Sequence, residues 1–226
     1  MERPKQIVIE HYPERGIGAK YEKFKSPMEK TVQGIMFAVI NTMVARSILS
    51  AKNDARGLLW KAIAGFCVAD VAMYCSHMYF DLAKVKGSGT RIDMMREAFK
   101  KHHDDPTDYL DEKDTNLLIA AVELQAALFL LTRAVPKGNM RTILDFAIAI
   151  APLAQLTHKY AHCRNHDRHV PKLVRVLQDM GIILSGEKHK AHHSHVANVG
   201  NWSILSPLSN ALCNPIAQLF FTTKFH

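Results

Sequence analysis

The sequence predicts an all-α fold: an integral membrane bundle of about four transmembrane helices with a cytoplasmic helical cap. Three observations support this prediction. Long apolar segments recur along the 226 residues, the positive charges gather in alternate connecting segments, and 13 histidines cluster near the ends of the apolar segments. The length suits one domain, and 48% of the residues are hydrophobic, which is enough to bury a core.

Four apolar segments are the candidate spans, at residues 31–50, 58–80, 115–134 and 142–157. Each is long enough, or nearly so, to cross a hydrocarbon core about 30 Å thick as a helix. None is free of polar interruptions, which include Asp70 in the second span, and the mean hydropathy of −0.08 is low for a membrane protein. Buried helices of a soluble all-α bundle are therefore an alternative.

The distribution of Lys and Arg favours the membrane bundle. Seven lie in residues 1–30, seven in residues 82–114 and eight in residues 157–226, whereas the connectors 51–57 and 135–141 carry two each. Because basic connecting segments tend to stay in the cytoplasm, the three basic segments lie on one side and the two connectors on the other. The histidine clusters follow the second and fourth spans, so we expect them on the cytoplasmic side as well.

The remaining segments complete one domain. Residues 1–30 are expected to form a basic N-terminal arm, and residues 31–226 a single membrane domain. Apolar spacing predicts helices in residues 91–103 and 170–186. Residues 201–221 are apolar but contain two prolines, which suggests a packed or interfacial element. The net charge of +8 suits an anionic membrane surface or nucleic acid equally, and the four cysteines lack the spacing of a zinc ribbon.

The histidine clusters are the strongest functional signal. The sequence HKYAH (158–162) places two imidazoles four residues apart, and HKAHH (189–193) places three at spacings of three and four. Each set therefore shares one helix face. His102 and His103 add an adjacent pair. A lone histidine is more often a core or surface residue than a ligand, but several sets on one side of a bundle predict a metal site, because converging neutral imidazoles suit a divalent metal.

Other metal chemistries fit the sequence less well. The general base of an HEXXH zinc protease would stand at position 159, which is Lys159. No Cys–His zinc-finger spacing occurs. Eight histidines exceed the four ligands of a zinc ion, which indicates either two metals with nitrogen-rich shells or one metal with many spectators. The histidines at positions 11, 166, 169 and 226 are expected to be spectators.

Four segments in this order resemble the Kua/CarF lipid desaturase domain family: ADVAMYCSHMYFD (69–81), FKKHHDDPTDY (99–109), THKYAH (157–162) and LQDMGIILSGEKHKAHH (177–193). The resemblance runs from about residue 69 to residue 215. The HHDDPT sequence is closer to the plasmanylethanolamine desaturase branch than to the branch of the plastid phosphatidylglycerol fatty-acid desaturase. The fold that this resemblance implies is a membrane domain with a histidine-rich di-metal site in its cap.

The resemblance also implies which residues act. The ligands of two iron ions would be His77, His102, His103, His158, His162, His189, His192 and His193. Asp81 and His195 are assigned to the catalytic site. Asp81 would be a ligand or would orient a ligating imidazole, and His195 would replace a histidine that the family has shortly after the last box. Lys188 departs from the family pattern, which usually has a histidine there.

The activity implied by the resemblance is O2-dependent desaturation of a phospholipid at a di-iron centre, preferably with formation of a vinyl ether. An outside donor such as cytochrome b5 or ferredoxin would supply electrons, because the chain shows no haem, flavin or dinucleotide motif. The membrane would be the endoplasmic reticulum in a eukaryote or the inner membrane in a bacterium, and no nucleic acid partner is expected.

Two alternatives stay open. A fatty-acyl desaturase or a hydroxylase of the same superfamily would share these histidines. A non-enzymatic basic helical protein that binds metal and anionic lipid or nucleic acid would also explain the charge. Basic residues near the histidines could dock an acidic electron donor or a phospholipid head group, or they could simply form a solvated cytoplasmic face: Lys100, Lys101, Lys159, Lys172, Arg175, Lys188 and Lys190.

Overall fold

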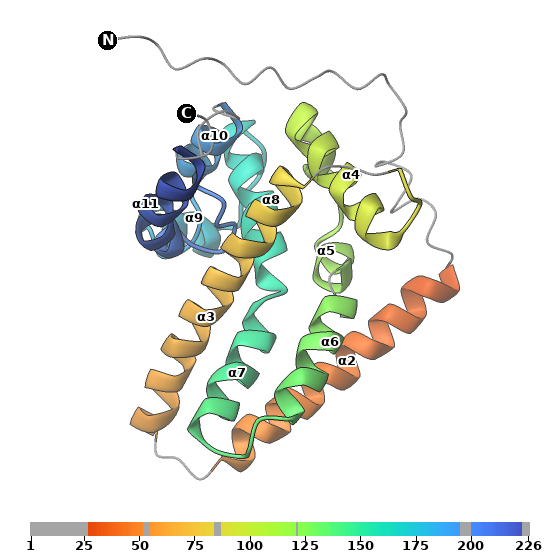
Figure 1. Cartoon of the computed structure of the whole chain (residues 1–226), viewed down its shortest axis with the longest axis vertical. Helices are drawn as coiled ribbons and strands as arrows, with labels where there is room; N and C mark the ends of the chain where they lie inside the picture. The colour runs from red at the N-terminus through yellow and green to blue at the C-terminus, as the bar shows by residue number, and fades with distance from the viewer. Residues whose placement is uncertain (1–26, 52–54, 84–86, 121, 195–199, 223–226) are drawn as a thin grey trace.

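The computed structural model describes residues 27–51, 55–83, 87–120, 122–194 and 200–222. Within these ranges the chain forms helices and no strands, which confirms the all-α prediction. Roughly aligned helices make the lower part of the molecule, and the other helices gather at its upper end (Figure 1). Most of the predicted N-terminal arm, together with His195, lies outside the described residues.

The candidate spans fall in α2 (Pro27–Ser50), α3 (Ala55–Leu82), α5 (Asp114–Ala120), α6 (Val122–Arg133), α7 (Asn139–Ile150) and α8 (Leu153–Asn165). In the part of the chain that the structure describes, three helical stretches are long and apolar enough to cross a membrane: Met28–Ser50, Arg56–Leu82, and α7 with α8 as Asn139–Asn165. The α5–α6 pair, bent by 42°, makes a fourth if it counts as one span. These stretches support a multi-pass membrane protein.

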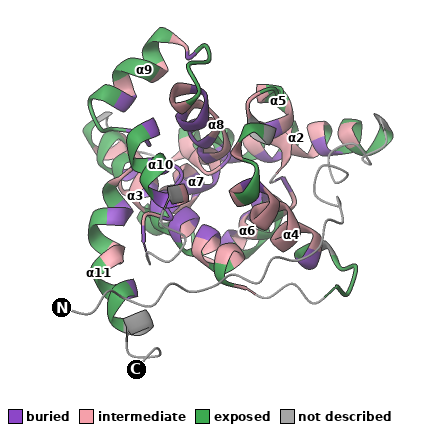
Figure 2. Cartoon of the chain, turned by 90° about the horizontal axis from the view of Figure 1, so that it is seen from above, coloured by how far each residue is buried: buried purple, intermediate pink, exposed green. Residues whose placement is uncertain are grey.

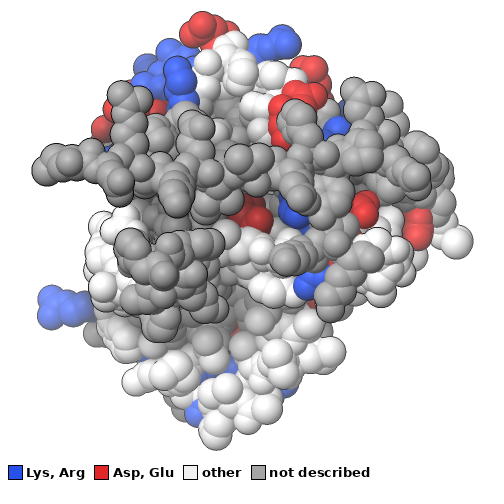
Figure 3. Space-filling model, turned by 45° about the horizontal axis from the view of Figure 1, so that its top comes forward, with Lys and Arg blue, Asp and Glu red and all other residues white. Residues whose placement is uncertain are grey.

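The outer surface of the bundle suits lipid. Large apolar side chains are exposed along it, among them Ile63 on α3 and Leu130 and Leu131 on α6, the last two at 69%. An exposed apolar surface of this extent marks contact with lipid or with another protein. On the face drawn in Figure 3, charged atoms gather toward the top of the view, and the lower part is mostly uncharged.

A glycine allows α3 and α7 to pack closely. A Cβ atom added at Gly65 would lie 2.5 Å from the Cβ of Phe146 and 2.8 Å from the carbonyl oxygen of Ile143. Small residues let membrane helices approach in this way. The close contact aligns α3 with the continuous stretch of α7 and α8, so that the upper ends of α3 and α8 lie together.

The remaining helices are α4 (Arg91–Asp104), the 3₁₀ helix η1 (Pro106–Tyr109), α9 (Lys172–Asp179), α10 (Gly186–Ser194) and α11 (Leu208–Thr222). The helix predicted for residues 170–186 ends earlier, because Gly181 turns the chain with a φ of 68° and α10 starts only at Gly186. Seen from above, buried residues gather where α3, α8 and α10 meet, whereas α9 and α11 are mostly exposed (Figure 2).

A buried carboxylate attaches the segment before α11 to the bundle. Asp70 of α3 is fully buried. Its two oxygens accept hydrogen bonds at 2.6–2.9 Å from the hydroxyls of Ser203, Ser206 and Ser209 and from the backbone N–H groups of Ser206 and Ser209. The polar residue that interrupts the second predicted span therefore fixes a loop. This loop reaches the site described next.

Candidate metal centre

All eight predicted histidine ligands and Asp81 come together at the upper end of the bundle, where α3, α4, α8 and α10 meet. They form two groups in which the possible ligand atoms lie within 4.8 Å of one another. The first group consists of His102, His158, His162, His189 and His193; the second consists of His77, Asp81, His103 and His192. The predicted spectators His166 and His169 are exposed and belong to neither group.

The five imidazoles of the first group point their Nε2 atoms at one another. His189 Nε2 lies 2.7 Å from that of His162, 2.8 Å from that of His158 and 3.0 Å from that of His193. An imidazole nitrogen carries at most one hydrogen in the ring plane, so hydrogen bonds do not account for several such contacts at one atom. Nitrogens at right angles around a metal, with bonds of about 2.0–2.1 Å, would be about 2.9 Å apart. The spacing therefore fits one coordination shell.

The second group surrounds a carboxylate. Asp81 Oδ1 lies 3.0 Å from His103 Nε2, and Asp81 Oδ2 lies 3.3 Å from the Nε2 atoms of both His77 and His192. Three of these atoms, Asp81 Oδ2 and the Nε2 atoms of His77 and His192, are buried and have no hydrogen-bond partner among the described residues. Buried polar atoms without partners are unfavourable. A cation between them would satisfy all three, so the second group also fits a metal ion.

Backbone carbonyls orient two of these imidazoles. His77 Nδ1 lies 2.9 Å from the carbonyl oxygen of Trp202, and His192 Nδ1 lies 3.2 Å from that of Gly200. An Nδ1–H that donates to a carbonyl leaves Nε2 with its lone pair directed at the site. Both carbonyls belong to the loop that Asp70 attaches to α3. The sequence analysis did not predict that this loop orients the histidines. The one indication in the sequence was Asp70, a carboxylate within an apolar segment.

The close packing of α10 on α8 brings the remaining ligands into place. A Cβ atom at Gly186 would lie 2.6 Å from Asn165 Oδ1 and 3.0 Å from the carbonyl oxygen of Ala161, so only glycine fits there without a shift. The side-chain amide of Asn165 donates to the carbonyl oxygen of Gly186 at 2.8 Å. With its first residue held in this way, α10 directs His189 and His193 toward the first group.

Burial keeps three of these histidines, His102, His189 and His193, neutral. Desolvation, followed by repulsion from neighbouring imidazoles, lowers the pKa of His102 and His189 well below the ordinary value of 6.5. The same causes lower the pKa of His193 to about 2. Neutral imidazole is the form that binds metals. The site therefore presents ligands that need not lose a proton near neutral pH.

An apolar helical bundle that carries two histidine-rich groups at one end defines a membrane protein with a candidate metal centre. The sequence model of the lipid desaturase domain matches residues 66–223. The chain therefore belongs to the lipid desaturase domain family, which confirms the resemblance found in the sequence. This match includes both histidine groups, and it supports an oxidoreductase function of the lipid desaturase type. No curated protein and no solved structure gives a match.

Proposed function

We propose that the protein is a membrane-bound, O2-dependent di-iron desaturase that introduces a C=C bond into an alkyl or acyl chain of a phospholipid. The observation that carries this proposal is the convergence of eight histidines and Asp81 into two groups in a chain of the lipid desaturase domain family. Nitrogen-rich shells with one carboxylate suit iron. The overall balance is one O2, two electrons and two protons consumed, with one C=C bond and two water molecules formed.

The protein residues would hold and orient the two irons. When bound, the irons and O2 supply the oxidising power that side chains lack. The five imidazoles of the first group would hold one ion, and the second group, with Asp81, would hold the other. The carbonyls of Trp202 and Gly200 would keep His77 and His192 directed at the second ion. Because most of these side chains are buried, they would also exclude water from the site.

The preferred product is a vinyl ether, as for a plasmanylethanolamine desaturase. This preference follows from the HHDDPT sequence at residues 102–107. The electron donor would be cytochrome b5 or ferredoxin, bound on the cytoplasmic side where the positively charged segments gather. The protein would reside in the endoplasmic reticulum of a eukaryote or in the inner membrane of a bacterium.

Metal analysis of the purified, detergent-solubilised chain tests the centre. We expect about two irons per chain, one for each group. The matched variants are His192→Ala, which removes a buried member of the second group, and His169→Ala, which removes an exposed histidine outside both groups. His192→Ala should lose iron and His169→Ala should keep it. Stoichiometric zinc in place of iron would contradict the proposal.

Lipid analysis of cells that express these variants tests the reaction. Wild type and His169→Ala should produce new vinyl ethers, and His192→Ala should not, at equal levels of folded protein. New acyl double bonds or hydroxylated chains without vinyl ethers would instead favour an acyl desaturase or a hydroxylase of the same superfamily. The absence of any lipid change with iron-loaded wild type and an added donor would refute the desaturase assignment.

A further inference from the structure

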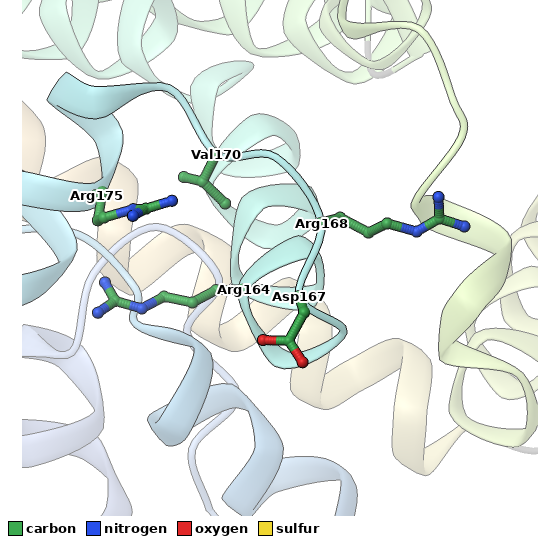
Figure 4. Close-up of a pocket in the computed structure, with 5 residues that line it drawn as sticks. All are labelled: Arg164, Asp167, Arg168, Val170 and Arg175. Carbon is green, nitrogen blue, oxygen red and sulfur yellow. The ribbon is translucent and has the colours of Figure 1, made fainter.

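A cavity at the upper end of α8 is separate from the metal centre. Its volume is about 310 Å³. The residues that line it come from the end of α8, the loop that follows, and α9: Arg164, Asp167, Arg168, Val170 and Arg175 (Figure 4). None of them belongs to either histidine group. Three arginines and one aspartate give the cavity charges of both signs.

Two guanidinium groups share one side of this cavity. Figure 4 shows those of Arg164 and Arg175 on the same side of the loop, whereas Arg168 extends to the opposite side. Arg164 Nη2 donates to Asp179 Oδ1 at 2.5 Å, and the side chain of Arg164 is 36% exposed. A guanidinium with open donors is the preferred partner of phosphate oxygens. The pair therefore suits a phosphate.

The carboxylate of Asp167 narrows the choice of ligand. Asp167 has a φ of 54°, a conformation that aspartate and asparagine adopt more readily than most residues. Figure 4 shows its carboxylate between Arg164 and Arg168. A purely anionic ligand would be repelled by this group. A ligand that joins a phosphate to an ammonium group would satisfy the guanidinium pair and the carboxylate together.

The cavity lies at the depth of lipid head groups. The candidate span Asn139–Asn165 has 27 residues, about 40 Å of helix, which exceeds a hydrocarbon core of about 30 Å. Arg164 in its last turn therefore lies beyond the hydrocarbon. The exposed side chains of Leu173 and Val176 on α9, and of Met180 directly after it, recur at spacings of three and four, so they share one face. An exposed apolar face beside basic residues is typical of a helix at a membrane surface.

We propose that this cavity binds the head group of a zwitterionic phospholipid from the bilayer. Arg164 and Arg175 hold its phosphate, Asp167 accepts hydrogen bonds from its ammonium group, and the apolar face of α9 contacts the acyl chains. The proposal concerns lipid binding outside the histidine site. Lipid binding here does not depend on the desaturase reaction, since the bound lipid need not be the substrate.

Binding of soluble short-chain lipids to the full chain in detergent tests this proposal. We expect dioctanoyl phosphatidylethanolamine to bind more tightly than dioctanoylglycerol, which lacks the head group, and than inorganic phosphate. Arg175→Gln should weaken phosphatidylethanolamine binding about tenfold, as expected for the loss of a charged hydrogen-bond donor. Arg168 also lines the cavity, but its side chain extends to the side opposite Arg164 and Arg175 (Figure 4), so Arg168→Gln should weaken binding less than Arg175→Gln does, by about twofold.

Asp167→Asn tests the binding of the ammonium group. Asparagine tolerates the same backbone conformation as aspartate. It should remove the preference for dioctanoyl phosphatidylethanolamine over dioctanoyl phosphatidic acid, which has no ammonium group. Equal effects of Arg175→Gln and Arg168→Gln, or no effect of either, would overturn the site. If inorganic phosphate binds as tightly as the phospholipid, the cavity is a site for free phosphate and the lipid assignment is wrong. Metal content is measured in parallel and should be the same in all variants.

Discussion

Replacement of Asp70 by asparagine should lower the stability of the protein. It should also weaken metal binding by the second group more than by the first. The carboxylate accepts two backbone N–H groups on different oxygens: Ser206 N–H on Oδ1 at 2.8 Å and Ser209 N–H on Oδ2 at 2.8 Å. Asparagine keeps one acceptor oxygen and places an NH2 group at the other position. The serine hydroxyls can rotate to accept from that NH2, but a backbone N–H cannot. Either orientation of the amide therefore leaves one buried N–H unsatisfied.

The size of the effect follows from these contacts. An unsatisfied buried donor costs about 1–3 kcal/mol, and each hydrogen bond to a charged acceptor contributes about 1.5–3 kcal/mol. We expect Asp70→Asn to lower the free energy of unfolding by about 3–5 kcal/mol. The loop that carries the carbonyls of Trp202 and Gly200 should loosen, so His77 and His192 lose the groups that orient them. The proposed iron of the second group should be lost before that of the first.

The assay is iron content per chain together with thermal unfolding of the purified protein. Asp145→Asn is the matched control, because Asp145 is also fully buried but serves a different network. It accepts a hydrogen bond from Ser47 at 2.5 Å and pairs with Arg133. Asp145→Asn should lower stability and keep both irons. The reasoning is refuted if Asp70→Asn keeps wild-type stability and iron content, or if Asp145→Asn loses as much iron as Asp70→Asn.

Three further substitutions probe the packing and the site. Asp81→Asn should lower the metal affinity of the second group about tenfold or more, which a chelator titration measures; an unchanged titration would contradict a role of the carboxylate in binding. Gly65→Ala should destabilise the bundle by about 1–3 kcal/mol in thermal unfolding because α7 is too close, whereas Gly34→Ala, with no atom within 4 Å, should be neutral or stabilising by up to about 1 kcal/mol. Gly186→Ala should displace α10 from Asn165 and lower iron content as well as stability; stability loss with full iron content would show that α10 tolerates the shift.

Most of what could be predicted from the sequence, namely the helices and the histidines that share a helix face, rests on helical spacing. Apolar segments and their connectors located the helices, and histidines four residues apart had to share a face. The orienting carbonyls had no such signature, because a backbone oxygen belongs to any residue type. His77 and Trp202 are 125 positions apart, and only the packing of α11 and its preceding loop on α3 brings them together. The cavity near Arg164 likewise depends on how α9 folds back on the end of α8.

The division of the histidines into two groups follows a rule that spacing alone could have suggested. Residues four apart fall in the same group: His158 with His162, His189 with His193, and His77 with Asp81. Adjacent histidines fall in different groups, His102 apart from His103 and His192 apart from His193. Successive side chains of an α-helix, with 3.6 residues per turn, point about 100° apart, so neighbours cannot easily face one point.

Each adjacent pair therefore joins the two groups through a single peptide bond. One pair lies on α4 and the other on α10, so the two groups are connected by two helices as well as by the bundle itself. A rigid shift of either helix would move ligands of both groups together. The spacing between the two proposed irons is thus set by helix geometry at two places, while the carbonyls of the Asp70 loop orient two imidazoles of the second group. We therefore expect a change at Asp70 to release the proposed iron of the second group before that of the first.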